Sequence, residues 1–321
     1  MEYTTMKKNI LGLILFLGSP LTLLASIWLK FVKQRGIGKI SDKIFMKIGL
    51  LPLIDNYYEP LINPKKYLTK SLRKDRKLNG IKFNVEEQIS LLSNFNFSKE
   101  LLQFPIEKKK ELEFYHNNGS YAFADAEYLY NIIRHFKPKR IIEIGSGNST
   151  LMACNAIKAN KIQDDNYSCN HICIEPFEQP WLEKLGIDVI REKVETLNYN
   201  LFEQLEKNDI LFIDSSHIIR PEGDVLFEYL EILPLLKQGV IVHIHDIFTP
   251  KNYLDNWVIN EHRLWNEQYI LEAFLTLNSE YRIIGALNYL HHNHKNEFDL
   301  SHPISAKNLG HEPGAFWIVR N

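Results

Sequence analysis

The chain has few cysteines and no excess of charge of either sign. Its 321 residues contain three cysteines, Cys154, Cys169 and Cys173, and an odd number so closely spaced provides no disulfide framework. Reduced thiols in a cytoplasmic protein are the simpler interpretation. Lys plus Arg number 38 against 39 for Asp plus Glu, so no overall field attracts nucleic acid. We therefore expect no nucleic-acid partner.

The chain also lacks internal repeats and low-complexity tracts, and it reads as an ordinary globular protein apart from one segment. Residues 10–29 ("ILGLILFLGSPLTLLASIWL") carry no charge and match the length of a membrane-crossing helix. Three interpretations remain open: a spanning helix or signal anchor, a cleaved secretory peptide, and a buried or interfacial helix pair broken at Gly18, Ser19 and Pro20.

An anchor would place the downstream domain at the inner, cytoplasmic face of the membrane. This expectation follows because the cations after the segment outnumber those before it. The cations before it are Lys7 and Lys8, and those after it are Lys30, Lys33, Arg35, Lys39 and Lys43.

Three segments are predicted along the chain: the hydrophobic residues 1–35, a helical accessory or lid region at 36–115, and a main domain at 116–321. In the second segment, residues 84–95 ("NVEEQISLLSNF") predict an amphipathic helix. In the third, Asp125 is expected to cap a helix that ends near Lys137.

From residue 140 onward, short apolar runs alternate with helical segments. The runs "RIIEIG", "HICIEP", "DILFID" and "GVIVHIHD" predict parallel strands, and "GDVLFEYLEILPLL" predicts an intervening helix. Two later runs, 281–290 and 314–321, predict an antiparallel pair at one edge. The pattern indicates an α/β fold whose ligands lie at the carboxyl ends of the strands. Glu143, Glu175, Asp214 and Asp246 all lie at or near those ends.

The turn "EIGSGNST" lacks the third glycine of a dinucleotide-binding loop, because Thr150 stands in its place. Gly145 and Gly147 still allow a tight turn, and Ser149 or Thr150 can cap the next helix. Glu143 would repel a phosphate but accept hydrogen bonds from an amine. Since Glu175 can accept the hydroxyls of a ribose, a nucleoside with a cationic, phosphate-free tail fits better than NAD.

These motifs resemble the class I S-adenosylmethionine-dependent methyltransferases over Tyr121 to the C-terminus. The resemblance implies a Rossmann-like seven-stranded sheet, mostly parallel with an antiparallel last strand, and S-adenosylmethionine as cofactor. Glu143, with the turn residues Gly145, Ser146, Gly147 and Ser149, would then lie near the methionine part, Glu175 at the ribose, Val194 and Glu195 around the adenine, and Asp214 beside the cofactor. The spacing from Glu143 to Glu175 is longer than usual for the family, which we attribute to the polar insert "KIQDDNYSCN".

"FIDSSH" and "HIHDIF" add a second group of polar residues at the ends of two expected neighbouring strands. Two aspartates, Asp214 and Asp246, could hold magnesium or another divalent metal, and His217 could take the proton of an alcohol that the metal acidifies. The group resembles the metal-dependent O-methyltransferases that act on sugars of macrolide antibiotics. That resemblance makes Asp214, His245 and Asp246 metal ligands and His217 the base; His245 replaces an expected glutamate and leaves room for manganese or zinc.

Other polar and aromatic residues have weaker interpretations. His243 is expected to be a packed histidine, and His291, His292 and His294 to lie in a solvated loop. The aromatic segment 249–275 is expected either to cover the substrate or to pack on the core, with Arg263 and Glu267 as a surface pair.

The sequence therefore predicts a methyltransferase that acts on a hydroxyl of a small molecule or glycan, most simply a sugar or glycolipid. Two alternatives stay open, a nucleotide-dependent oxidoreductase on a related sheet and a non-catalytic, membrane-tethered scaffold. The oligomeric state is not predicted.

Overall fold

A computed structural model describes residues 2–321, with side chains from residue 9 onward. The side chains of Lys7 and Lys8, used above to orient the N-terminal segment, lie outside the described residues. The chain forms two compact units, Met1–Thr69 and Lys70–Asn321. The division into three segments at residues 35 and 115 stays a prediction.

The first unit contains four helices. They are α1 (Glu2–Leu17), α2 (Ser19–Gln34), α3 (Lys39–Ile48) and α4 (Pro64–Tyr67). The break at Gly18 confirms the predicted interruption, and Pro20 lies in the first turn of α2, where its missing N–H costs nothing. Among the described residues no single helix is long and apolar enough to cross a membrane. The two helical segments Asn9–Leu17 and Ser19–Gln34 are together long and apolar enough, but they are bent by 55° at the break between them. No described side chain of α2 is buried, so this unit does not bury the pair.

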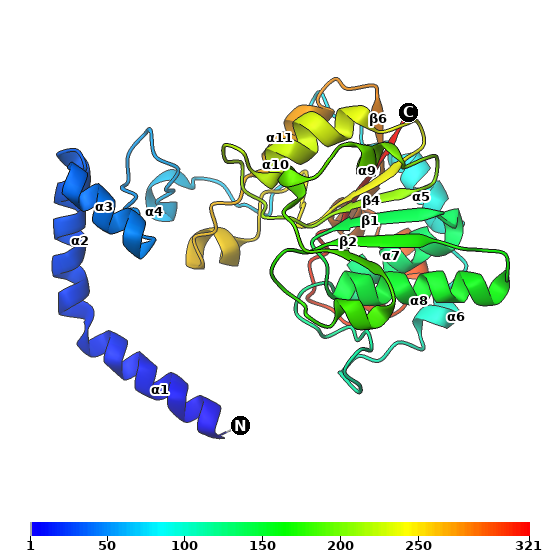
Figure 1. Cartoon of the computed structure of the whole chain (residues 1–321), viewed down its shortest axis with the longest axis horizontal. Helices are drawn as coiled ribbons and strands as arrows, with labels where there is room; N and C mark the ends of the chain where they lie inside the picture. Colours follow the sequence, from blue (N-terminus) through cyan, green and yellow to red (C-terminus); the bar gives the residue numbers. More distant parts are fainter. Residues whose placement is uncertain (1) are drawn as a thin grey trace. The chain divides into compact units, whose positions relative to one another are not determined.

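The second unit is built on a seven-stranded sheet (Figure 1). The strands are β1 (Arg140–Ile144), β2 (Asn170–Ile174), β3 (Asp188–Ile190), β4 (Ile210–Ile213), β5 (Ile241–Ile244), β6 (Tyr281–Ala286) and β7 (Phe316–Arg320). Their order is β3-β2-β1-β4-β5-β7-β6, and β7 runs antiparallel to both of its neighbours while the other pairs are parallel. The predicted Rossmann-like sheet with an antiparallel last strand is confirmed.

Helices cover both faces of this sheet, which explains why its strands are continuous apolar runs. On one face Ile141 packs with α7 (Phe123–Phe136) and α8 (Asn148–Gln163), and on the other Ile142 packs with α10 (Asp224–Phe227) and α11 (Glu267–Leu275). The remaining elements are α5 (Val85–Ser93), α6 (Ser98–Leu101), α9 (Asn200–Glu203), α12 (Leu287–Asn293), α13 (Lys295–Ser301), η1 (Leu182–Leu185), η2 (Val194–Thr196), η3 (Glu228–Ile232), η4 (Leu233–Leu235), η5 (Asn256–Asn260) and η6 (Ser305–Lys307).

Three local predictions were wrong or incomplete. Asp125 does not cap α7, because the helix begins two residues earlier and the buried Asp125 carboxylate accepts the backbone N–H groups of Gly314 and Ala315. The run 281–290 leaves the sheet at Ala286 and continues as α12, so His291 and His292 lie on a helix rather than in a loop. Strand β3 was not located, since three residues are too few to show a period.

His116 gives the second unit a dependence on pH. Its ring is fully buried between Phe114 and Phe123, and neither ring nitrogen has a hydrogen-bond partner among the described residues. Burial lowers the pKa of His116 to about 4. The unfolded chain therefore binds more protons between about pH 6.5 and 4, and stability falls as the pH falls through that window.

We expect His116→Phe to lose less stability on acidification than the unsubstituted protein. The substitution removes the buried His116 imidazole, whose lowered pKa makes the folded state of the unsubstituted protein less stable at low pH. Melting temperatures of both proteins at pH 7 and pH 5 test this expectation, and equal losses in the two proteins would contradict it.

Candidate functional site

The turn after β1 passes directly against the end of β4. Gly145 has a φ of +75°, and a Cβ atom there would lie 1.9 Å from the carbonyl oxygen of Asp214. Glycine is therefore required at this position. Gly147 differs, because an added Cβ would meet only Gln179 Nε2, at 4.0 Å. Thr150 Oγ1 accepts the Gly147 N–H at 3.0 Å and so helps to cap α8, as expected.

Glu143 and Ser149 find their partners inside the protein. Ser149 Oγ donates to Glu143 Oε1 at 2.6 Å, and His171 Nε2 lies 2.8 Å from Glu143 Oε2. All three side chains are buried, and Cys173 Sγ lies 3.5 Å from the same carboxylate. The structure therefore gives Glu143 a role between β1 and β2 and does not bring it or Ser149 into the cavity described next.

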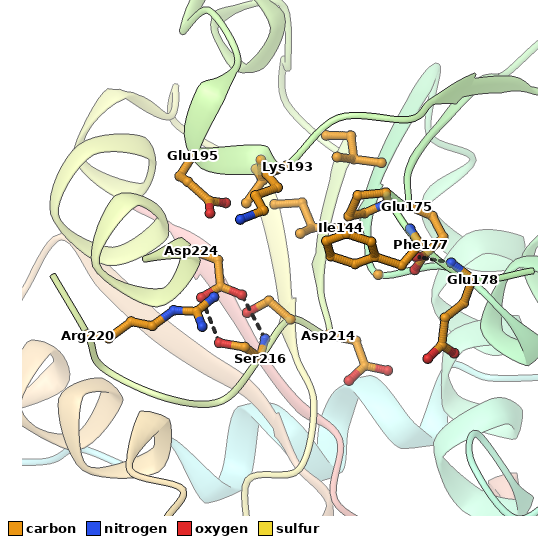
Figure 2. Close-up of a pocket in the computed structure, with 15 residues that line it drawn as sticks. Ile144, Glu175, Phe177, Glu178, Lys193, Glu195, Asp214, Ser216, Arg220 and Asp224 are labelled. Carbon is orange, nitrogen blue, oxygen red and sulfur yellow. Dashed lines mark hydrogen bonds between the residues drawn. The ribbon is translucent and has the colours of Figure 1, made fainter. Parts of the chain in front are cut away.

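A cavity of about 410 Å³ opens at the carboxyl ends of β1, β2 and β4 (Figure 2). We call it the first cavity. It brings together five residues predicted from the sequence, namely Gly145, Glu175, Val194, Glu195 and Asp214. Its lining is mainly acidic. The two cations, Lys193 and Arg220, are outnumbered by five carboxylates, those of Glu175, Glu178, Glu195, Asp214 and Asp224. Such a lining favours a cationic ligand over a phosphate.

Glu175 holds the rim of the first cavity in shape. Its Oε1 accepts the backbone N–H groups of Phe177 and Glu178, each at 2.9 Å, as Figure 2 shows. Its Oε2 lies 3.3 Å from the N–H of Ser146, whose own hydroxyl is buried and has no partner among the described residues. A carboxylate with spare acceptor capacity and an unpaired hydroxyl suit a polar ligand at this point.

A second group of polar side chains surrounds His217, at the ends of β4 and β5. His217 Nε2 lies 3.3 Å from Asp214 Oδ1 and 3.6 Å from Asp246 Oδ2. On the other side of the ring, Nδ1 lies 2.7 Å from Oε2 of Glu267, which is fully buried. Tyr229 donates to Glu267 Oε1 at 3.2 Å. Glu267 therefore fixes the orientation of the ring and directs Nε2 toward the two aspartates.

The backbone of this group is unusual. His217 and Asp246 have φ angles of +61° and +56°, in the left-handed region that residues other than glycine seldom adopt. Such conformations cluster at functional sites, where the surrounding structure holds them in place. Trp265 packs against the His217 ring, with centroids 4.4 Å apart, and contributes to that restraint.

The electrostatics of the group favour a cation. Burial alone would lower the pKa of His217, but its interactions with Asp214, Glu267 and Asp246 raise that pKa well above its ordinary value. Burial also raises the pKa of Asp246. Three carboxylates around one imidazole therefore hold a proton, and a metal ion could take its place.

Asp214, His217 and Asp246 form a possible metal site. Each offers one ligand atom, and these atoms lie within 4.8 Å of one another. Of the predicted ligands, His245 is the one that the structure leaves outside this set, although its Nε2 lies 3.6 Å from Asp246 Oδ1. The oxygen and nitrogen donors suit magnesium, manganese or zinc.

His243 is packed inside the sheet. Its ring lies 4.0 Å from that of Phe212 and 4.5 Å from that of Trp317, and burial lowers its pKa well below the ordinary value. It is a packed core residue, as expected, but neither of its ring nitrogens has the expected hydrogen-bond partner among the described residues.

A second cavity, of about 340 Å³, adjoins Asp246 of the His217 group. Its lining includes His245 and Asp246, the aromatic rings of Phe123, Phe248 and Trp257, and polar groups of Ser120, Asp125, His311 and Glu312. Asp214 lines the first cavity and Asp246 the second, and His217, which lines neither, has its Nε2 within 3.3 Å of the first aspartate and 3.6 Å of the second. The aromatic segment 249–275 has two parts. Leu254 and Trp257 line the second cavity, whereas Leu271 and Leu275 of α11 pack in the core.

Glu267 was misjudged from the sequence. Instead of a surface pair with Arg263, it is buried beside His217, while Arg263 pairs with Glu261 at 2.6 Å and lies over Trp257 and Trp265. Fifty residues separate Glu267 from His217. No spacing rule links them, so only the three-dimensional packing could show this pair.

Comparison with known proteins supports a methyltransferase domain. Residues 142–247 match a family described as "Methyltransferase domain". An uncharacterised protein of Archaeoglobus fulgidus is 29% identical over 221 residues, which cover 65% of this chain and 87% of that protein.

Two solved structures show weaker similarity. An O-methyltransferase from Bacillus cereus in complex with S-adenosylhomocysteine has a TM-score of 0.35 and 12% identity, covering 72% of this chain and 91% of its own. A putative methyltransferase from Thermobifida fusca has a TM-score of 0.36 and 13% identity, and the match covers 76% of this chain and 97% of that protein. Neither similarity is strong enough to assign an acceptor to this chain.

Gly145→Ala should lower the free energy of unfolding by at least about 2 kcal/mol, from the clash with Asp214 and the left-handed backbone. Gly147→Ala is the matched control and should change it by less than half as much. Urea unfolding of the ligand-free proteins measures both. Equal effects would show that the close approach to β4 does not constrain the turn.

Proposed function

We propose that this protein transfers a methyl group from S-adenosylmethionine to a hydroxyl of a sugar or glycolipid-type acceptor, with assistance from a divalent metal. The observation that carries the proposal is that His217, held in place by a buried carboxylate, directs Nε2 toward two aspartates that line different cavities, Asp214 the first and Asp246 the second. A cofactor in one cavity and an acceptor in the other would bring their reacting atoms together there.

The first cavity suits the cofactor. Its acidic lining would stabilise the positively charged sulfonium centre and would disfavour the pyrophosphate of NAD, which argues against the oxidoreductase alternative. Glu175 would accept the ribose hydroxyls, and Val194 with Glu195 would surround the adenine. The Gly145 turn allows close approach of the methionine part, near the unpaired hydroxyl of Ser146.

The chemistry requires one proton to be removed. His217 Nε2 would take the proton of the acceptor hydroxyl as its oxygen attacks the methyl carbon and the carbon–sulfur bond breaks. The products are the methyl ether, S-adenosylhomocysteine and a proton held on His217. Glu267, 2.7 Å from Nδ1, would stabilise the imidazolium that forms.

Asp214 and Asp246 would hold the divalent metal, with His245 next to Asp246, and Nε2 of His217 would stay off the ion so that it remains free to accept the proton. A bound cation there would lower the pKa of the acceptor hydroxyl. Its charge would also offset the two carboxylates, which otherwise favour the protonated form of His217.

A sugar is the acceptor that suits the second cavity. The rings of Phe248 and Trp257 offer apolar faces for a pyranose ring, and polar groups such as those of Ser120 and His311 could bind its hydroxyls. The exposed apolar helices α1 and α2 favour an acceptor carried by a lipid at the membrane.

Transfer of a labelled methyl group from S-adenosylmethionine to a panel of methyl glycosides tests the activity, with catechol and benzoate as comparison acceptors. His217→Ala should lower kcat about 10²- to 10⁴-fold, the usual range for loss of a general base. Glu267→Gln should lower kcat less and leave the affinity for S-adenosylhomocysteine unchanged, since it acts through His217. Glu203→Gln, a change at an exposed carboxylate that lines neither cavity, serves as the control.

Activity that survived His217→Ala, in protein shown to be folded, would refute the assignment of the base. If methyl transfer were equally fast after removal of all divalent metal, the proposed metal assistance would be wrong, but the methyl transfer itself would stand.

Cofactor binding is tested separately by calorimetric titration with S-adenosylhomocysteine. Glu175→Gln keeps the shape of the side chain and should weaken binding about tenfold, equivalent to about 1.4 kcal/mol. Glu192→Gln, an exposed neighbour, should have no effect. NADH should not bind; tight NADH binding with no response to S-adenosylhomocysteine would favour the oxidoreductase.

A further inference from the structure

Helix α3 (Lys39–Ile48) carries two exposed rows of opposite character. Ile40, Ile44 and Ile48 recur every four residues and have exposed fractions of 78%, 50% and 69%. Residues spaced in this way lie on one side of a helix. An exposed apolar row of this length is unusual on a helix that only faces water.

The second row consists of Lys39, Lys43 and Lys47, each one residue before an isoleucine of the first row. Since successive residues are about 100° apart around a helix, the lysine row runs directly beside the isoleucine row. All three lysines are exposed, and among the side chains that the structure describes none of them forms an ion pair. The opposite side of the helix is anchored within the first unit by Phe45, which is buried.

The charge around α3 is mainly positive, although α3 itself carries one acid, Asp42. Residues 30–69 contain eight Lys or Arg against three Asp or Glu. Two of those acids are already paired, Glu59 with Lys33 at 2.8 Å and Asp55 with Lys66 at 3.1 Å. Most of the positive charge on this stretch of the chain is therefore free to meet an anionic partner.

We propose that α3 lies in the surface of a lipid bilayer that contains anionic phospholipids, with its isoleucines in the acyl-chain boundary and its lysines against the head-group phosphates. A helix with adjacent apolar and cationic rows has the pattern of an interfacial helix. The same unit bears the exposed apolar residues of α1 and α2, so a lipid surface would cover the apolar side chains of all three helices. The site is separate from the proposed methyl-transfer site and does not depend on it.

Vesicle flotation of the full-length protein tests this inference. One set of vesicles contains phosphatidylcholine alone and the other contains phosphatidylcholine with 30% phosphatidylglycerol. Insertion of the uncharged residues 10–29 contributes to binding of both kinds of vesicle. The ratio of the two partition coefficients therefore reports the electrostatic contribution to binding. We expect that ratio to exceed about tenfold at low salt and to fall at 0.5 M NaCl. The triple substitution Lys39→Gln, Lys43→Gln and Lys47→Gln should reduce it at least about fivefold.

The matched control replaces Lys108, Lys109 and Lys110 with glutamine. These lysines are also exposed and consecutive along the chain, but they lie in the second unit. The control removes the same charge and should leave the ratio nearly unchanged. A second substitution, Ile44→Ser, should weaken binding to both kinds of vesicle.

Three outcomes would overturn the proposal. One is a partition that does not depend on phosphatidylglycerol. Another is an equal loss in the control and in the α3 variant. If α3 instead joined two copies of the chain, the α3 variant would change the mass measured by light scattering and leave the lipid dependence intact, which would equally refute it.

Discussion

The hydrogen bond between His217 and Glu267 is the interaction on which the site depends. A carboxylate with no exposed surface is stable only if its oxygens are satisfied, and Glu267 meets this need with His217 on one side and Tyr229 on the other. The constraint works in both directions, because the same bond turns Nε2 of His217 toward Asp214 and Asp246. The left-handed backbone of His217 is the conformational cost of this arrangement.

The sheet supplies the rest of the geometry. Strands β4 and β5 are parallel neighbours, so Asp214 and Asp246 reach the same edge, each on the side of a different cavity. The turn at Gly145 touches Asp214 and so ties the first cavity to the His217 group through the backbone. A small shift of β4 would therefore change the first cavity and the position of the His217 group together.

Patterns within one element were readable from the sequence, and contacts between distant elements were not. The apolar runs located six strands, and the acids that follow them marked the functional edge. Glu143 lies inside β1 and pairs with His171 within the sheet, whereas Glu175 follows the last residue of β2 and faces a cavity. Which way each carboxylate turns depends on neighbours 28 to 50 residues away, as with Glu267, and no local spacing encodes them. Asp125 shows the same limit, since its partners Gly314 and Ala315 lie at the other end of the domain.

A crystal structure with S-adenosylhomocysteine bound would test the central claim most directly, because that claim concerns where two ligands meet. The account predicts the ribose at Glu175 and the sulfur directed toward Asp214 and His217, with the second cavity open to an acceptor. A bound molecule that lay outside the first cavity, or whose sulfur pointed away from His217, would contradict it.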